Sequence, residues 1–250
     1  MKSITVGLVA LSSLAVCRPL LAEPAGVQPA YNSYYTGQIT AIGDGTLDLH
    51  VLRGHSGIVH PVNTDEKTEV VLLNGKSGKV GDLNVGQWVK AYWAGDPSDP
   101  KRQKVVKIEP GMAPWAAQRL ADLSTNAAAL DVSVRASTNG KGNHEELHLI
   151  GPEHPGGYKE PFFVRLSKGE MTGLLRVLAV EGFLADAFDT KTINAQPQPP
   201  APPFLTLAIG DLCQHRAATP ETIGRLELLA DALPEPAAKE LLRLLGKVRK

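Results

Sequence analysis

Short runs of alternating apolar and polar residues dominate the chain between positions 36 and 109. The run 38–42 leads into Asp44-Gly45, a two-residue signal for a β-hairpin, and 46–51 follows with an apolar residue at every second position. Further strand patterns lie at 58–62, 69–73, 87–93 and 104–108. Short strands with turn signals at this spacing predict a small antiparallel barrel or sandwich.

After position 111 helix patterns alternate with strand patterns. Ser167 and Glu170 have the spacing of a capping box, and apolar side chains follow at the period of a core-facing helix. Two more helices are expected to begin at 219–220 and 235–236, where proline suits the first turn. The other elements predicted here are a short helix at 116–123 and strands at 129–137, 145–150, 162–166 and 204–209.

These patterns predict the fold class β followed by α+β. We expect a small antiparallel OB-like barrel, then an antiparallel sheet covered by helices on one face. Residues 110–114 are expected to form an exposed joint between the two parts. The expected divisions are a signal peptide at 1–22, a lead-in at 23–35, the barrel at 36–109, and the α+β domain at 112–250 with a Pro-rich loop at 196–203.

The barrel segment resembles a known bacterial family. The similarity is carried by 36–42, by Thr46-Leu47-Asp48-Leu49, by Leu73-Asn74-Gly75-Lys76 and by 82–89. The family comprises small secreted OB-like β-barrel domains of unknown function. The resemblance covers residues 36–109 only. It implies the barrel fold and carries over no catalytic residue.

The N-terminus has the pattern of an export signal. Lys2 precedes an apolar run from position 4 to 16, and a cleavage site follows at Ala22. A run this short fits a cleaved signal peptide better than a membrane span. The mature chain is therefore expected in the periplasm or outside the cell. A lipoprotein anchored through Cys17 is the alternative, which Val16 disfavours because that processing prefers a small residue there.

Charge and cysteine content restrict the partners. The chain has 26 basic and 26 acidic residues, and cleavage would remove Lys2 and Arg18, leaving 24 against 26. This balance gives no electrostatic drive toward nucleic acid or anionic lipid, so no nucleic-acid partner is expected. No later apolar run is long enough for a transmembrane segment. Only Cys213 would remain, so no intrachain disulfide is expected.

The segment His144-Glu145-Glu146-Leu147-His148 matches the H-E-x-x-H zinc motif. That chemistry needs a helix, because only the helical period brings positions i and i+4 together. Turn residues on both sides predict a strand instead, on which His144 and His148 would lie about 13 Å apart. We therefore expect no metal site, and keep a metal-dependent hydrolase with Glu145 as catalytic residue as an alternative.

Other residues with chemical potential are few. Trp88 and Tyr92 share one face of their strand and could stack on a ligand, although packing against a loop or the second domain is the simpler interpretation. Cys213 and His215 are too close in sequence to define a thiol dyad, and a buried cysteine at the start of a loop or helix is expected. No phosphate-binding loop occurs, and we expect no cofactor.

The leading functional hypothesis is an exported, non-enzymatic binding or interaction protein of the cell envelope, with an envelope protein or glycan as partner. The alternatives are the metal-dependent hydrolase and a structural envelope scaffold. Ligand-dependent tryptophan fluorescence would favour the first, a bound metal the second, and concentration-dependent assembly the third.

Export is directly testable. Expressed in a bacterium, the protein should leave the cytoplasm with an N-terminus at or near Glu23, because the apolar run is followed by a cleavage site after Ala22. Intact-mass analysis of cell fractions measures this. A cytoplasmic product that retains residues 1–22 would contradict the prediction, and a lipid mass on Cys17 would replace it with the lipoprotein alternative.

Overall fold

The structure is a computed structural model that describes residues 33–53, 56–94, 104–138, 144–157, 163–191 and 197–249. The described residues belong to one compact unit, residues 31–250. The expected signal peptide and Cys17 lie outside the described residues, as does the lead-in up to position 32.

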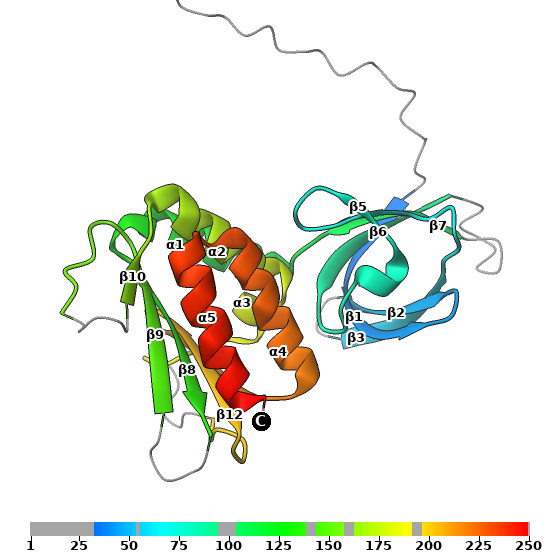
Figure 1. The fold of residues 1–250 in the computed structure, drawn as a ribbon. Helices are drawn as coiled ribbons and strands as arrows, with labels where there is room; N and C mark the ends of the chain where they lie inside the picture. The colour runs from blue at the N-terminus through cyan, green and yellow to red at the C-terminus, as the bar shows by residue number, and fades with distance from the viewer. Residues whose placement is uncertain are drawn as a thin grey trace, which may run out of the picture. The chain divides into compact units, whose positions relative to one another are not determined.

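A seven-stranded sheet has the strand order β3-β2-β1-β6-β7-β4-β5 (Figure 1). A 3-10 turn, η1 (Val80–Asp82), lies between its fifth and sixth strands in sequence. The strands are β1 (Ser33–Gly43), β2 (Thr46–Arg53), β3 (Ser56–Asn63), β4 (Glu69–Val71), β5 (Ser77–Gly78), β6 (Trp88–Ala94) and β7 (Lys104–Pro110).

The predicted hairpin at Asp44-Gly45 is confirmed. Gly43 pairs with Thr46 across a two-residue turn, and Gly45 has a φ of +70°, which favours glycine. A β-bulge between Ile39 and Ala41 shifts the register of β1 against β2. On β2, the apolar alternation places Leu47 and Leu49 on the buried face of the sheet.

A six-stranded sheet, with the order β10-β9-β8-β12-β13-β11, forms the other β layer. Its strands are β8 (Asp131–Ser137), β9 (His144–Ile150), β10 (Phe163–Arg165), β11 (Phe188–Asp189), β12 (Phe204–Ile209) and β13 (Leu212–Ala217). The helical segments are α1 (Pro114–Thr125), η2 (Ala127–Ala129), α2 (Lys168–Val180), α3 (Phe183–Asp186), α4 (Pro220–Glu227), η3 (Leu228–Ala232) and α5 (Glu235–Val248).

The α+β class is confirmed, but neither sheet is purely antiparallel. β4 pairs with β7 in parallel, and β10 pairs with β9 in parallel. Both pairs are joined by long connections, which a parallel crossover requires and a hairpin signal does not reveal. Within the described residues the first sheet is open, with β3 and β5 at its two edges.

Local signals placed most helices correctly. The hydroxyl of Ser167 accepts a hydrogen bond from the amide of Glu170 at 3.2 Å, and the Glu170 carboxylate accepts from the amide of Ser167 at 2.7 Å. This is the predicted capping box at the start of α2. The helix α5 lies against β8 and β9, so the expected cover of one sheet face is present (Figure 1).

Three strands were not predicted, namely β5, β11 and β13. β13 contains Cys213 and His215, where we expected a loop or helix start. Gly210, with a φ of +55°, and Asp211 form a two-residue turn that pairs Ile209 with Leu212. Gly-Asp is a hairpin signal, so this strand could have been found from the sequence.

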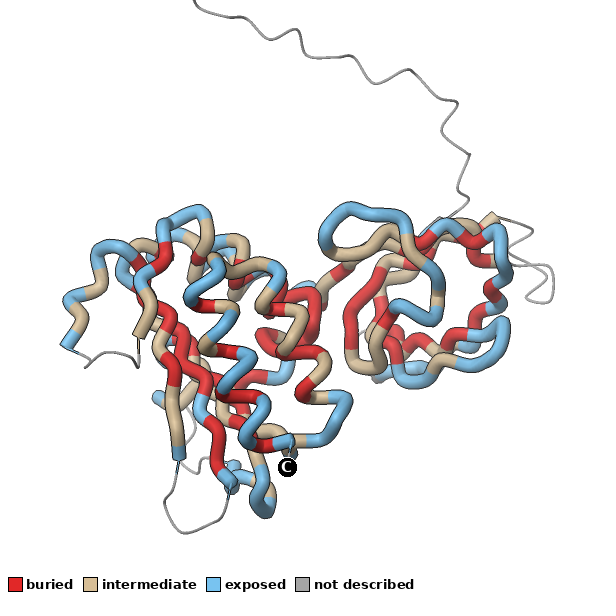
Figure 2. The backbone as a smooth tube through the Cα atoms, viewed as in Figure 1, coloured by how far each residue is buried: buried red, intermediate tan, exposed pale blue. Residues whose placement is uncertain are grey.

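The buried apolar side chains of the described residues form two hydrophobic clusters, and β6 contributes to both. Val89, Ala91 and Trp93 belong to the cluster of the first sheet. Trp88 belongs instead to the cluster formed by the second sheet and its helices. Figure 2 shows buried residues concentrated along the strands and on the inner sides of the helices. β6 therefore contributes side chains to both cores.

The prediction of an exposed joint at 110–114 is wrong for residues 111 and 113, which are buried. Ala113 is 0 % exposed, and the amide of Gly111, also buried, donates to the carbonyl of Trp88 at 2.9 Å. Trp115 of α1 packs edge-on against Trp88, with ring centroids 5.7 Å apart. The sequence could not show that α1 folds back onto β6 and buries the connection.

Glycine is required where the first sheet meets the end of α2. Gly182 has a φ of +76°, and a Cβ there would lie 2.9 Å from the carbonyl oxygen of Gly86. Gly75 has nearly the same φ, +79°, and a Cβ added to it would meet no atom within 4 Å. We expect Gly75→Ala to cost about 1 kcal/mol of unfolding free energy, from the backbone conformation alone.

Gly182→Ala should cost at least about 1 kcal/mol more than this control, because the Gly86 carbonyl is held by hydrogen bonds and cannot move aside without disturbing its neighbours. Urea denaturation of both variants measures the difference. Equal losses for the two variants would show that the contact between Gly182 and Gly86 contributes nothing.

Candidate functional site

A buried ion pair lies where the turn before β6 meets the helices. Arg225 of α4 is 3 % exposed, and its Nε lies 3.4 Å from Oε2 of Glu181. Its Nη2 donates to the carbonyl of Gly86 at 3.4 Å, and the side-chain amide of Gln38 donates to the same carbonyl at 3.0 Å. One guanidinium thus connects α4, the end of α2 and the turn from the first sheet.

Glu181 is the most unusual group of this cluster. It caps the C-terminal end of α2, where the helix macrodipole disfavours a negative charge, and it is 0 % exposed. Burial raises the pKa of its carboxyl group, and the nearby charges of Arg225 and Arg216 oppose that shift only in part. Its Oε1 has no hydrogen-bond partner among the described residues. A buried acceptor without a donor is costly, so this atom calls for an explanation.

Phe183 lies beside the same cluster. The guanidinium carbons of Arg216 and Arg225 lie 4.7 and 5.1 Å from the centre of its ring. Arg216 also pairs with Asp186 at 2.6 Å, and burial lowers the pKa of Arg216 to about 10. The π-system of this one ring therefore stabilises both guanidinium groups near the carboxylate of Glu181.

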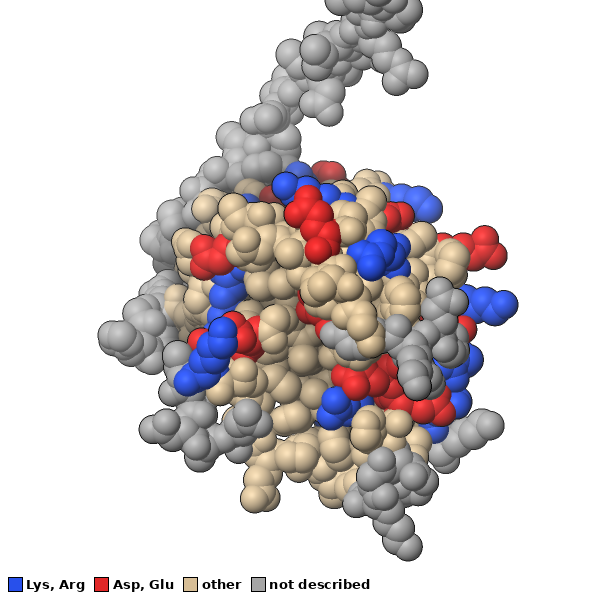
Figure 3. Space-filling view, turned by 90° about the vertical axis from the view of Figure 1, so that its left-hand side faces the viewer, with Lys and Arg blue, Asp and Glu red and all other residues tan. Residues whose placement is uncertain are grey.

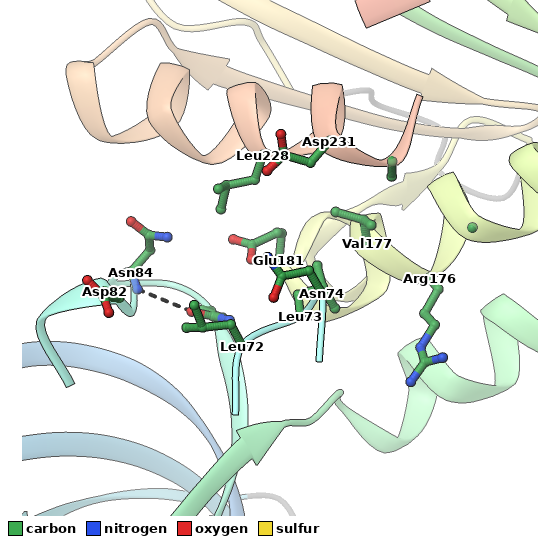
Figure 4. A pocket seen from close by; sticks show the side chains of 13 residues that line it. Leu72, Leu73, Asn74, Asp82, Asn84, Arg176, Val177, Glu181, Leu228 and Asp231 are labelled. Carbon is green, nitrogen blue, oxygen red and sulfur yellow. Dashed lines mark hydrogen bonds between the residues drawn. The ribbon is translucent and has the colours of Figure 1, made fainter. Parts of the chain in front are cut away.

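A pocket of about 360 Å³ opens over Glu181 (Figure 4). Its walls are residues 72–74 after β4, residues around η1, one side of α2, and η3. Figure 4 shows the Glu181 carboxylate directed from the end of α2 toward the space between Asn84 and Leu228. Five of the lining residues are leucine, valine or alanine and form an apolar wall, and the buried carboxylate of Glu181 lies among the polar residues that complete the lining.

The turn that forms one wall is held firmly. The amide of Asn84 donates to Oε1 of Gln87 at 3.1 Å, and the amide of Gln87 donates to the carbonyl of Asn84 at 3.1 Å (Figure 4). The amide of Gly86 donates to the carbonyl of Ile39 of β1 at 2.7 Å. The wall is therefore fixed to the first sheet before any ligand arrives, which lowers the entropy lost on binding.

The predicted stacking residues lie in different surroundings. Trp88 is 3 % exposed and buried in the second hydrophobic cluster, so its ring offers no open face. Tyr92 is half-buried, and its hydroxyl donates to Glu109 at 2.5 Å. Its ring lies 5.4 Å from that of Tyr34, which is 55 % exposed. The aromatic surface of this sheet is thus formed by Tyr34 and Tyr92.

The residues of the H-E-x-x-H match lie on β9, so the predicted strand is confirmed. His144 pairs with Ser137, and His148 pairs with Ser133, four residues along the same strand. Nδ1 of His148 lies 2.9 Å from Asp131. The alternation of a strand directs Glu145 to the opposite face from both histidines, and the motif does not converge.

Glu145 instead binds α5. Its carboxylate contacts Arg243 at 2.9 Å and also Lys247, and hydrogen bonds from these two side chains lower its pKa. Cys213 and His215 lie two residues apart on β13, where His215 hydrogen-bonds Thr206 at 2.9 Å. Within the described residues, no group of three histidine, cysteine, aspartate or glutamate side chains is placed to hold a metal ion.

Glu181 and Arg225 were not predicted from the sequence. One signal was available: Glu181 interrupts a run that is apolar from Val177 to Leu184 apart from Gly182. A charged residue inside such a run is buried only when it is paired or functional. The partner, Arg225, is 44 positions away, and nothing local links the two.

Comparison with models of protein families, with curated proteins and with solved structures gave no match for this chain. Among the described residues, no helix has both the length and the apolar character needed to span a membrane. On the face drawn in Figure 3, acidic and basic side chains are interspersed.

The raised pKa of Glu181 predicts a pH dependence of stability. Because the folded state binds the proton of Glu181 more tightly than the unfolded state, protonation of Glu181 stabilises the folded protein. This contribution to the unfolding free energy is fully present below the unfolded-state pKa, about 4.3, and is lost as the pH rises through the folded-state pKa. Glu181→Gln is neutral at every pH and lacks this loss. We expect the unfolding free energy of the variant minus that of the wild type to increase from pH 4 toward neutrality, measured by urea denaturation.

The exposed Glu153 provides the matched control. Glu153→Gln should show no comparable trend, because its side chain is exposed in the folded protein. A difference between Glu181→Gln and wild type that stays constant with pH would contradict the prediction.

Proposed function

We propose that the protein is an exported, non-enzymatic binding protein of the cell envelope, acting in the periplasm or outside the cell, that takes a small ligand in the pocket over Glu181. The observation that carries the proposal is the buried Oε1 of Glu181, which lacks a donor among the described residues, together with the apolar pocket that Glu181 lines. Ligand sites typically combine apolar walls with a few well-placed polar groups.

The dimensions of the pocket support this proposal. Its volume of about 360 Å³ falls within the usual range for small-molecule sites, roughly 300–1,000 Å³. Its walls come from both hydrophobic clusters, since Leu72 packs against the first cluster, Leu73 packs against the second, and Val177 belongs to the second. Binding sites commonly lie at such junctions between packed units.

We interpret residues 36–109 as an OB-like barrel domain and 112–250 as an α+β domain that provides the helical wall of the pocket. The resemblance to small secreted bacterial domains supports the first part, as do the order of short strands and the bulge in β1. In this interpretation the turn before β6 is the binding loop of the barrel.

A second candidate is glycan binding at the pair Tyr34 and Tyr92. Tyr34 is 55 % exposed, and the ammonium groups of Lys90 and Lys107 lie 5.8 and 5.7 Å from the centres of the two rings. Exposed aromatic rings stack on the apolar faces of sugars, and the lysines would favour an acidic glycan. Comparing glycan retention by the wild type and by Tyr34→Ala tests this candidate separately from the pocket. Loss of retention in the variant would support it.

A pocket-filling variant tests the main proposal. Gly173 of α2 lines the pocket, and a Cβ at this position would meet no atom within 4 Å. Gly173→Leu should therefore occupy the pocket without distorting the helix, and should raise stability by up to about 1 kcal/mol, because leucine is the better helix former. Binding of small apolar probes such as 1-octanol, measured by calorimetry, should be lost.

Gly246→Leu is the matched control. Gly246 also lies within a helix, α5, with open space at its Cβ position, and it does not line the pocket. This variant should bind the probe like the wild type. Equal binding by wild type and Gly173→Leu would overturn the assignment of the binding site to this pocket.

A further inference from the structure

We propose that the pocket over Glu181 selects ligands that carry an ammonium or guanidinium group on an apolar body, and that this cationic group pairs with Oε1 of Glu181. The inference rests on the proposed function and deepens it by naming the chemical class of the ligand.

The two carboxylate oxygens of Glu181 differ in their contacts. Oε2 faces Arg225, whose guanidinium also reaches the carbonyl of Gly86. Oε1 has no such partner among the described residues, and Figure 4 shows the carboxylate turned into the pocket. Because a carboxylate accepts hydrogen bonds and donates none when ionised, the missing partner is a donor.

The charges around the opening favour a positive donor. Asp82 of η1 and Asp231 of η3 are exposed and line the pocket together with Glu181. Among the described residues of the lining, the basic side chain is that of Arg176, which lies apart from Glu181 in Figure 4. Three acidic groups against one basic group give the lining a net negative charge, which attracts cations and repels anions.

The apolar walls define the rest of the ligand. Leu72, Val177 and Leu228 line the space next to the carboxylate. An alkyl or aromatic body would bury its surface against these side chains, while its cationic end would satisfy Oε1. A purely polar cation gains nothing from the walls, and a purely apolar molecule leaves Oε1 without a donor.

The test uses the full-length protein and three probes of equal length, octylamine, 1-octanol and octanoate, in isothermal titration calorimetry. We expect octylamine to bind about tenfold more tightly than octanol, because its ammonium group makes a charge-assisted hydrogen bond to Glu181. Octanoate should bind more weakly than octanol, because its carboxylate is repelled by the acidic lining. Tighter binding of octanoate than of octylamine would overturn the inference.

Two variants locate the selectivity. Glu181→Gln keeps the shape of the side chain, and should remove the preference for octylamine over octanol. Asp231→Asn leaves the pair of Glu181 and Arg225 intact and keeps the test open should the first variant fail to fold. It should weaken octylamine binding about twofold without changing octanol binding. Glu153→Gln, an exposed change outside the pocket, should leave all three probes unaffected.

Binding of octylamine should also depend on pH. Burial raises the pKa of Glu181, and a cation at Oε1 lowers it again, so octylamine should bind more tightly as the pH rises from about 5 to about 8. Glu181→Gln should show no such trend. The charged groups that face Glu181 or surround the pocket are Arg225, Arg216, Asp82, Asp231 and Arg176.

The cationic group could belong to a free amine or to a lysine side chain of a peptide. A peptide Ac-Leu-Lys-Leu-NH₂ and its Lys→Gln analogue distinguish these sources. Preference for the lysine peptide over octylamine would assign the site to polypeptide ligands, and the reverse would assign it to free amines. In either case the inference requires the lysine peptide to bind more tightly than its Lys→Gln analogue, and equal binding of the two peptides would count against it.

Failure of the inference differs from failure of the proposed function. If octanol and octylamine bind with equal affinity and Gly173→Leu abolishes the binding of both, the proposed ligand class is wrong but the pocket remains the binding site. An absence of binding for all three octyl probes and both peptides would overturn both.

Discussion

The contact of Arg225 with Glu181 and Gly86 is the interaction on which the arrangement of residues 31–250 depends. It joins α4, the end of α2 and the turn before β6 through one buried guanidinium. Breaking such a pair from one side leaves an uncompensated buried charge, which costs about 3–5 kcal/mol. Well-packed apolar residues in place of such a pair are often as stable or more stable, so we infer that the ion pair specifies which surfaces meet.

The same contact also creates the candidate site. Arg225 occupies only one oxygen of Glu181, and the second oxygen has no donor among the described residues and lies beneath an apolar pocket. The glycines at 86 and 182 allow the backbone of the turn and the helix end to approach closely. A side chain at either position would separate the surfaces and change the pocket. Structural specificity and binding chemistry are thus carried by the same few residues.

The burial of Trp88 explains why the two halves are coupled. Its strand faces the first cluster with Val89 and Ala91, while Trp88 enters the second cluster and meets Trp115 of α1. Stability changes in one core should therefore reach the other through β6. A ligand in the pocket would contact both halves, and its binding would favour the conformation in which they are joined.

The sequence alone determined the local elements. The capping box at Ser167, the turn at Asp44-Gly45 and the alternation in β8 and β9 were all predicted, because each depends on neighbouring residues. The turn residues on both sides of the H-E-x-x-H match also predicted correctly that it lies on a strand. Only the tertiary structure decided the parallel pairings, the burial of the connection at 111–113 and the meeting of Glu181 with Arg225. These depend on contacts between residues far apart in the chain, and no local periodicity encodes which distant surfaces will bury one another.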